Sequence, residues 1–145
     1  MKRILFGLLL ACAAALAHAQ SFPARPVTLL ITFPPGGPTD IAGRALAEAT
    51  AKYLGQPVVV ENRPGAGGNI GAEAAARSAP DGYTLFMTTN NIHSMNPLLY
   101  AKLSYDSNRD FAPVAPLLST SLVLVQNPAV KAGSVRELVA LAKAS

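Results

Sequence analysis

Glycine, proline and small polar residues are concentrated in three short stretches of the 145-residue chain. These are PPGGPTD at 34–40, PGAGGN at 64–69 and TTNNIH at 88–93, and each follows an apolar run. Such stretches expose backbone N–H groups and hydroxyls, and the N-terminus of a following helix adds unsatisfied donors and a dipole that favours anions. The sequence therefore predicts a site for a carboxylate or phosphate that needs no buried lysine or arginine.

The glycine loop at 64–69 has to be tested as a nucleotide site, because dinucleotides also bind between a strand and a helix. A G-x-G-x-x-G pattern starting at Gly65 requires glycine at position 70, where the chain has isoleucine. The nearest candidate for the ribose-binding acid, Asp81, precedes the next strand, and no G-x-x-x-x-G-K-[ST] pattern occurs. A nucleotide-dependent α/β enzyme remains an alternative, and so does a purely structural tight turn.

Other kinds of chemistry lack the side chains that they need. Cys12 is the only cysteine, and His18 and His93 are the only histidines, so no metal-binding pair and no nucleophile with an obvious base remains beyond residue 19. Basic residues are scattered singly, without the clusters and interleaved aromatics of a nucleic-acid binder. We therefore expect no enzyme activity, cofactor or metal and no nucleic-acid partner.

Three side chains in or beside the loops have competing roles. Asp40 either caps the following helix or contacts a ligand, and both interpretations stay open. His93 is interpreted first as a hydrogen-bonded loop histidine rather than as a functional group. For Arg63 an ion pair with Glu61 at the surface is favoured over contact with a ligand carboxylate.

Strand-like and helix-like segments alternate around these loops. Apolar, β-branched runs predict strands over residues 27–33, 58–61 and 83–89. Helical spacing predicts one helix from a Thr39–Asp40 cap to Gly55, a C′ glycine, and a second over 70–78 with Asn69 as its cap. The order indicates an α/β fold with a mostly parallel sheet flanked by helices, whose ligands bind beyond the carboxyl ends of the strands.

The C-terminal third is less regular in sequence. It predicts a helical turn over 94–100 and two further strands over 111–118 and 121–125. A helix follows, opened by the capping box Ser134–Glu137. That helix reaches residue 145 without a C-cap glycine, so we expect the chain to be the N-terminal part of a longer protein.

Residues 1–19 have the pattern of an export signal: a basic start at Lys2 and Arg3, an apolar run, and Ala17-His18-Ala19 before the cleavage point. The apolar run is shorter than the roughly 20 residues of a membrane-spanning helix. We expect cleavage after Ala19, a periplasmic protein, and residues 20–145 as an incomplete N-terminal α/β lobe. Lipidation at Cys12 stays open, because the residues before it partly match a lipobox.

Three segments closely resemble a known family: ITFPPGGPTDIAGR at 31–44, LGQPVVVENRPGAGGNIGAEAAARSAPDGYTL at 54–85 and NPLLYAKLSYDSNRDFAPVAPL at 96–117. They resemble the Bug or TctC type of periplasmic receptor of the tripartite tricarboxylate transporters. The resemblance implies a type II periplasmic-binding-protein fold, in which two lobes close over a small organic carboxylate. It also implies a receptor without catalytic activity, monomeric at full length, that passes its ligand to membrane permease subunits.

The resemblance also implies which residues bind the ligand, largely through main-chain N–H groups and water. Carried over to this chain, they are Phe33, Pro34, Gly36, Gly37, Thr39 and Asp40, then Ala66, Gly67, Gly68 and Asn69, and then Thr88, Thr89 and Asn90, with His93 as an added candidate. Pro38 stands where the family often has glycine, so the first loop loses one N–H donor. The second lobe is absent from this chain, and a non-functional truncated remnant is therefore a further alternative.

Overall fold

The computed structural model describes residues 22–121 and 123–144. The predicted signal peptide, its cleavage point and Cys12 lie outside the described residues. The described residues divide into two compact units, one that ends at residue 112 and one that begins at residue 113, and we describe them separately. Among the described residues, none of the helices has the length and apolar character that a membrane span requires.

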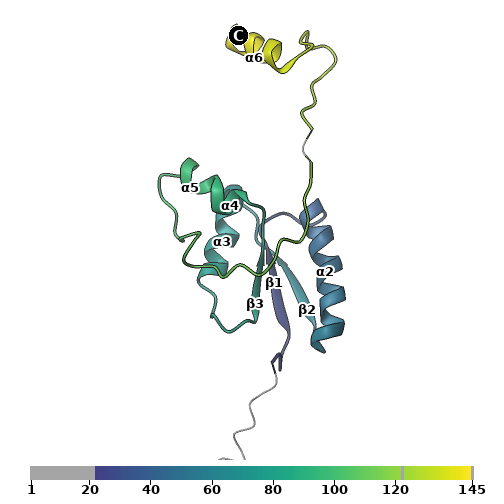
Figure 1. Cartoon of the computed structure of the whole chain (residues 1–145), viewed down its shortest axis with the longest axis vertical. Helices are drawn as coiled ribbons and strands as arrows, with labels where there is room; N and C mark the ends of the chain where they lie inside the picture. Colours follow the sequence, from purple (N-terminus) through teal and green to yellow (C-terminus); the bar gives the residue numbers. More distant parts are fainter. Residues whose placement is uncertain (1–21, 122, 145) are drawn as a thin grey trace, which may run out of the picture. The chain divides into compact units, whose positions relative to one another are not determined.

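The first unit is built on a three-stranded parallel sheet in the order β2-β1-β3 (Figure 1). Its strands are β1 (Val27–Ile31), β2 (Val58–Asn62) and β3 (Thr84–Met87). The central strand pairs with β2 from Val27↔Val58 onward and with β3 from Thr28↔Thr84 onward. The prediction of a parallel α/β sheet is confirmed, and β1 is buried on both faces because it has a strand on each side and helices above and below.

Helix α2 (Pro38–Leu54) covers one face of this sheet, and α3 (Asn69–Ala76) covers the other (Figure 1). Because side chains alternate along a strand, Leu29 and Ile31 pack with Ala47 on the α2 side. On the α3 side the approach is close enough that a Cβ at position 71 would lie 2.9 Å from Thr32 Cγ2. Gly71 therefore lets α3 lie directly against the sheet.

The helix boundaries differ from those predicted in ways that matter for the loops. The predicted Thr39–Asp40 cap of α2 is wrong, because the N-cap is Gly37, with Pro38 in the first turn and no side-chain cap. Gly55 is the predicted left-handed C-terminal glycine, with φ 66°. The predicted capping role of Asn69 is wrong, since Gly68 is the N-cap and Asn69 is the first helical residue. Its side chain is thereby released to bond elsewhere.

Short helices lie before α3 and after β3 in the first unit. The single-turn helix η1 (Ala66–Gly68) precedes α3, and α4 (Asn91–Ser94) and α5 (Asn96–Leu99) follow β3, broken at Met95. The helical turn predicted over 94–100 is present as α5, with Pro97 in its first turn. Ile92, Ala72 and Tyr105 form the small core on this side of the sheet.

The second unit contains α6 (Val135–Ala144) and an extended segment before it. The strands predicted over 111–118 and 121–125 are wrong for the residues described there, because an extended segment becomes a strand only when a neighbouring backbone satisfies its N–H and C=O groups. The capping box is confirmed on one side: Ser134 Oγ accepts from the Glu137 N–H at 3.3 Å. Glu137 itself reaches one residue further back and accepts from the Gly133 N–H at 2.7 Å.

Candidate functional site

Each strand of the sheet ends in one of the three predicted loops. We name them loop A (residues 32–37, after β1), loop B (63–68, after β2) and loop C (88–90, after β3). The strands are parallel, so all three loops lie at the same edge of the sheet. Direct contacts link them: Thr32 Oγ1 lies 3.0 Å from Thr88 Oγ1, and the amide of Asn91, just after loop C, donates to the Gly67 carbonyl at 2.8 Å.

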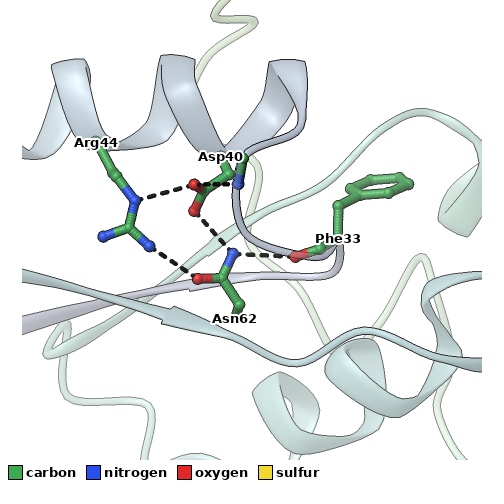
Figure 2. Close-up of polar contacts among 5 residues, drawn as sticks. Phe33, Asp40, Arg44 and Asn62 are labelled. Atoms are coloured by element: carbon green, nitrogen blue, oxygen red, sulfur yellow. Dashed lines mark hydrogen bonds and ion pairs between the residues drawn. The ribbon is translucent and has the colours of Figure 1, made fainter.

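A buried carboxylate organises loop A (Figure 2). Asp40, in the first turn of α2, is only 2% exposed. One of its oxygens accepts from the Gly36 N–H and from Arg44 Nε, both at 2.9 Å, and the other accepts from Asn62 Nδ2 at 2.9 Å. The carboxylate therefore ties together loop A, the body of α2 and the end of β2.

Asn62 completes this group, which we call the Asp40 hub (Asp40, Arg44 and Asn62). Its Nδ2 also donates to the Phe33 carbonyl at 3.0 Å, and its Oδ1 accepts from Arg44 Nη2 at 3.1 Å. The amide thus closes a ring of polar contacts under the loop, as Figure 2 shows. Loop A is held at two backbone positions by side chains from outside the loop.

The Asp40 hub is strongly ionic. The hydrogen bond from Arg44, followed by those from Gly36 and Asn62, holds the pKa of the Asp40 carboxyl well below its usual range, and Asp40 in turn raises the pKa of Arg44. Asp40 is not the predicted N-cap, because Gly37 holds that position: its carboxylate lies in the third helical position and accepts from the Gly36 N–H, just before the N-cap.

A neutral amide organises loop B. The Asn69 Oδ1 accepts from Asn96 Nδ2 at 2.6 Å and from the Tyr105 hydroxyl at 2.8 Å. Asn96 Nδ2 also donates to the Gly67 carbonyl at 3.2 Å, and Gly67 has the left-handed φ of 63° that turns its carbonyl into this cluster. We call Asn69, Asn96 and Tyr105 the Asn69 hub.

Two other predicted side chains are engaged within the protein. His93 Nδ1 lies 3.0 Å from the Ser107 carbonyl, and its ring stands edge-on to Phe111. The hydrogen bond favoured from the sequence is present, but His93 lies in α4 and not in a loop. Arg63 pairs with Glu61 at 2.6 Å, as expected, and both side chains are partly exposed.

The fourteen predicted site residues all lie in the three loops or in the helical turns that follow them. They are Phe33, Pro34, Gly36, Gly37, Thr39, Asp40, Ala66, Gly67, Gly68, Asn69, Thr88, Thr89, Asn90 and His93. Sequence reasoning missed Arg44, Asn62, Asn96 and Tyr105, which support the loops from behind. Only Arg44 carried a local signal, since it stands four residues after Asp40 on a helix.

The electrostatic character of this edge fits a small anion. The N–H groups of α2 before Ile41, whose N–H donates to the Gly37 carbonyl, have no partner from a preceding turn, apart from Pro38, which has no N–H. At the start of α3 the Asn69 N–H donates to the Ala66 carbonyl of η1, so the free donors there begin after it. The carboxylate of Asp40 faces inward and is balanced by Arg44. Among the described residues no cluster of three or more His, Cys, Asp or Glu side chains is placed to hold a metal.

Comparison with known proteins identifies the group to which the chain belongs. Residues 42–145 match the family described as the tripartite tricarboxylate transporter family receptor, TctC. Protein BugT of Bordetella pertussis is 43% identical over 149 residues, a match that covers 99% of this chain and 46% of BugT. The chain thus spans less than half the length of this relative.

The chain is also similar to solved structures. BugD, a periplasmic binding protein, is 43% identical with a TM-score of 0.61, over 63% of this chain and 30% of BugD. MatC from Rhodopseudomonas palustris, solved with bound malate, is 45% identical with a TM-score of 0.63, over 66% and 33% of the two chains. An R. palustris protein solved with adipate is 34% identical with a TM-score of 0.66, over 85% and 41%.

The parallel sheet flanked by helices is accordingly the N-terminal portion of a periplasmic-binding-protein fold. The family partners the permeases of tripartite transporters. The chain belongs to the tripartite tricarboxylate transporter receptors of the TctC or Bug type, a family of periplasmic substrate-binding receptors and not of enzymes.

Proposed function

We propose that this chain is the N-terminal lobe of a receptor that captures a small organic carboxylate and delivers it to a tripartite tricarboxylate-type permease. The observation that carries the proposal is the convergence of loops A, B and C, cross-linked at one edge of the sheet, with helix N-termini behind loops A and B. The malate-bound and adipate-bound relatives support the carboxylate class.

In this proposal the ligand carboxylate lies against loops A and B and is held mainly by backbone N–H groups. Direct contacts come from residues with exposed or half-exposed surfaces, such as Gly37, Thr39, Gly67 and Asn69. Asp40 acts differently, because its carboxylate is buried and already accepts three hydrogen bonds, so it shapes loop A without touching the ligand. His93 has the smallest part, since its ring packs against Phe111.

The test is a binding measurement on the protein expressed from its whole reading frame. Isothermal titration calorimetry with malate, adipate, citrate, glutamate and benzoate is expected to give saturable binding of at least one carboxylate. NAD and ATP serve as negative controls, and saturable binding of either one in place of the carboxylates would favour the nucleotide alternative. Residues 20–145 alone are expected to bind far more weakly, because the ligand then contacts one lobe only.

Export is the second part of the proposal, and it rests on the composition of residues 1–19. Mass spectrometry of the protein recovered from the periplasmic fraction is expected to place the mature N-terminus at Gln20. A mature chain that begins at Cys12 with an added lipid mass would establish the lipoprotein alternative instead. Sedimentation of the complete receptor is expected to give a monomer.

A further inference from the structure

The Gly67 carbonyl fixes the direction of a short chain of hydrogen bonds. It accepts from Asn91 Nδ2 at 2.8 Å and from Asn96 Nδ2 at 3.2 Å. A carbonyl oxygen only accepts, so the nitrogen of the Asn96 amide, and not its oxygen, must face loop B. The backbone of the loop therefore sets the orientation of a buried side chain that is 3% exposed.

The same Asn96 nitrogen sets the orientation of the next amide. It lies 2.6 Å from Asn69 Oδ1, and the Tyr105 hydroxyl donates to that oxygen at 2.8 Å. Burial raises the pKa of the Tyr105 hydroxyl, which keeps its proton for this bond. If the Asn69 amide reversed, its NH2 group would face the Asn96 NH2 group, which cannot accept, and the Tyr105 hydroxyl would have to turn its proton away and accept. The Asn96 nitrogen therefore fixes the direction of the Asn69 amide.

The Asn69 side-chain nitrogen is thereby left available as a hydrogen-bond donor. Its Nδ2 makes no hydrogen bond within the described residues, and the atom is not enclosed, because no unpaired buried side-chain nitrogen or oxygen is present among them. An amide NH2 carries two donors and no acceptor. This group follows directly on the backbone of loop B, at the start of α3.

We propose that Asn96 and Tyr105 are positioning residues that turn the Asn69 NH2 group outward, so that loop B selects a ligand with an acceptor oxygen at this point. The inference rests on the proposed function and deepens it. An ionised carboxylate offers such oxygens, whereas an ammonium group or a protonated donor does not. Because the Asn69 hub is neutral, it adds a donor without a fixed charge beside the anion.

Reversing the hydrogen-bond direction tests the proposal. In Asn96→Asp the carboxylate can only accept, so Asn69 must donate to it and turn its own oxygen outward. The Kd of the best-bound carboxylate in the panel is expected to rise about 100-fold, the loss of a charge-assisted hydrogen bond plus repulsion. Tyr105→Phe leaves Asn96 in place and is expected to raise the Kd about 3-fold to 10-fold.

Tyr53→Phe is the matched control, since Tyr53 is 91% exposed on α2 and its removal is expected to leave the Kd unchanged. A second measurement uses the wild-type protein, so it tests the proposal even if Asn96→Asp does not fold. In ¹H–¹⁵N spectra of the protein from the whole reading frame, the Asn69 side-chain NH2 signals are expected to shift when the carboxylate saturates.

The outcomes separate the two proposals. If a carboxylate binds but the Asn69 NH2 signals do not move, or Tyr105→Phe binds like Tyr53→Phe, the positioning inference is wrong while the receptor function stands. If the folded wild-type protein binds no member of the panel, the receptor function fails and the inference fails with it.

Discussion

Loops A and B are held by two hubs that have similar hydrogen-bonding patterns but differ in charge: the Asp40 hub is ionic and the Asn69 hub is neutral. In each, a side chain from the first turn of a helix accepts several hydrogen bonds and ties its loop to distant parts of the unit. The acceptor is the ionised carboxylate of Asp40 in loop A and the neutral amide oxygen of Asn69 in loop B. The charge of Asp40 is balanced by Arg44, whereas Asn69 needs no counter-ion.

The difference teaches how an anion site can be rigid without repelling its ligand. A carboxylate accepts more strongly than an amide, so it fixes a loop firmly, but its charge has to be buried and compensated. An amide accepts more weakly, yet it keeps a donor for the ligand. We infer that the charged hub supports the site from behind and the neutral hub faces the ligand.

The largest difference in thermal stability between the two hubs is expected when the central acceptor of each, Asp40 or Asn69, is replaced by alanine. Asp40→Ala leaves the Gly36 N–H, the Asn62 amide and the Arg44 guanidinium without their acceptor and is expected to lower the Tm by about 10 °C or more. Asn69→Ala leaves two donors, one of them a rotatable hydroxyl, and should lower the Tm by no more than about 5 °C. Thermal unfolding by circular dichroism measures both, and equal losses would contradict the comparison.

The charged hub should also make the protein sensitive to acid. The folded-state pKa of Asp40 is depressed, so its contribution to stability is present above the unfolded value near 3.9 and is lost as the pH falls below about 4 toward the lower folded-state pKa. Asp40→Asn should therefore be less stable than wild type at pH 7 and lose less on going from pH 5 to pH 2.

Urea unfolding at several pH values gives the difference between the two proteins. Asp81→Asn is the control, because that carboxylate is 42% exposed and pairs with Arg25 at the surface. An Asp40→Asn profile parallel to that of wild type would show that the buried carboxylate does not govern the acid limb.

Within the charged hub, Asn62 should matter almost as much as the ions. Asn62→Ala removes the donor to the Phe33 carbonyl and to Asp40 and is expected to destabilise the protein by about 1–3 kcal/mol. It should also weaken carboxylate binding, because loop A loses one of its two anchors. Asn90→Ala, in exposed loop C, should change the free energy of unfolding by no more than about 0.5 kcal/mol.

A smaller effect than in either hub is expected at the guanidinium beside loop B. Arg63 is 53% exposed and pairs with Glu61, so Arg63→Ala should change stability by less than about 1 kcal/mol. Its carboxylate Kd should stay within about 2-fold of wild type, since backbone and amide donors hold the ligand in our proposal. Calorimetry that gave a much larger loss would make Arg63 a direct ligand contact and loop B a charged site.

Local patterns in the sequence predicted what local physics determines. The apolar run around Leu29, the turn prolines and glycines of loop A and the left-handed Gly55 each act within a few residues, and the structure contains them all. The three loops could be placed at one edge because parallel strands bring their carboxyl ends together. The sequence therefore predicted the positions of the loops and of the helices that begin after loops A and B.

Long-range contacts were beyond this reasoning. Asn69 meets Asn96 and Tyr105 across 27 and 36 positions of the chain, and no spacing rule joins such residues. Asn69 was assigned a capping role because its residue type favours caps, but Gly68 occupies that position. The apolar runs at 111–118 and 121–125 predicted strands, yet a strand also needs a neighbouring backbone to pair with, which composition does not supply.

The 2-1-3 order of the sheet has a consequence for how the protein is made. The central strand β1 is the first to leave the ribosome, and both of its partners, from Val58 and from Thr84 onward, are synthesised later. Each pairing closes a long loop, a topology that slows assembly. Until Met87 has been synthesised, the three-stranded sheet cannot be completed.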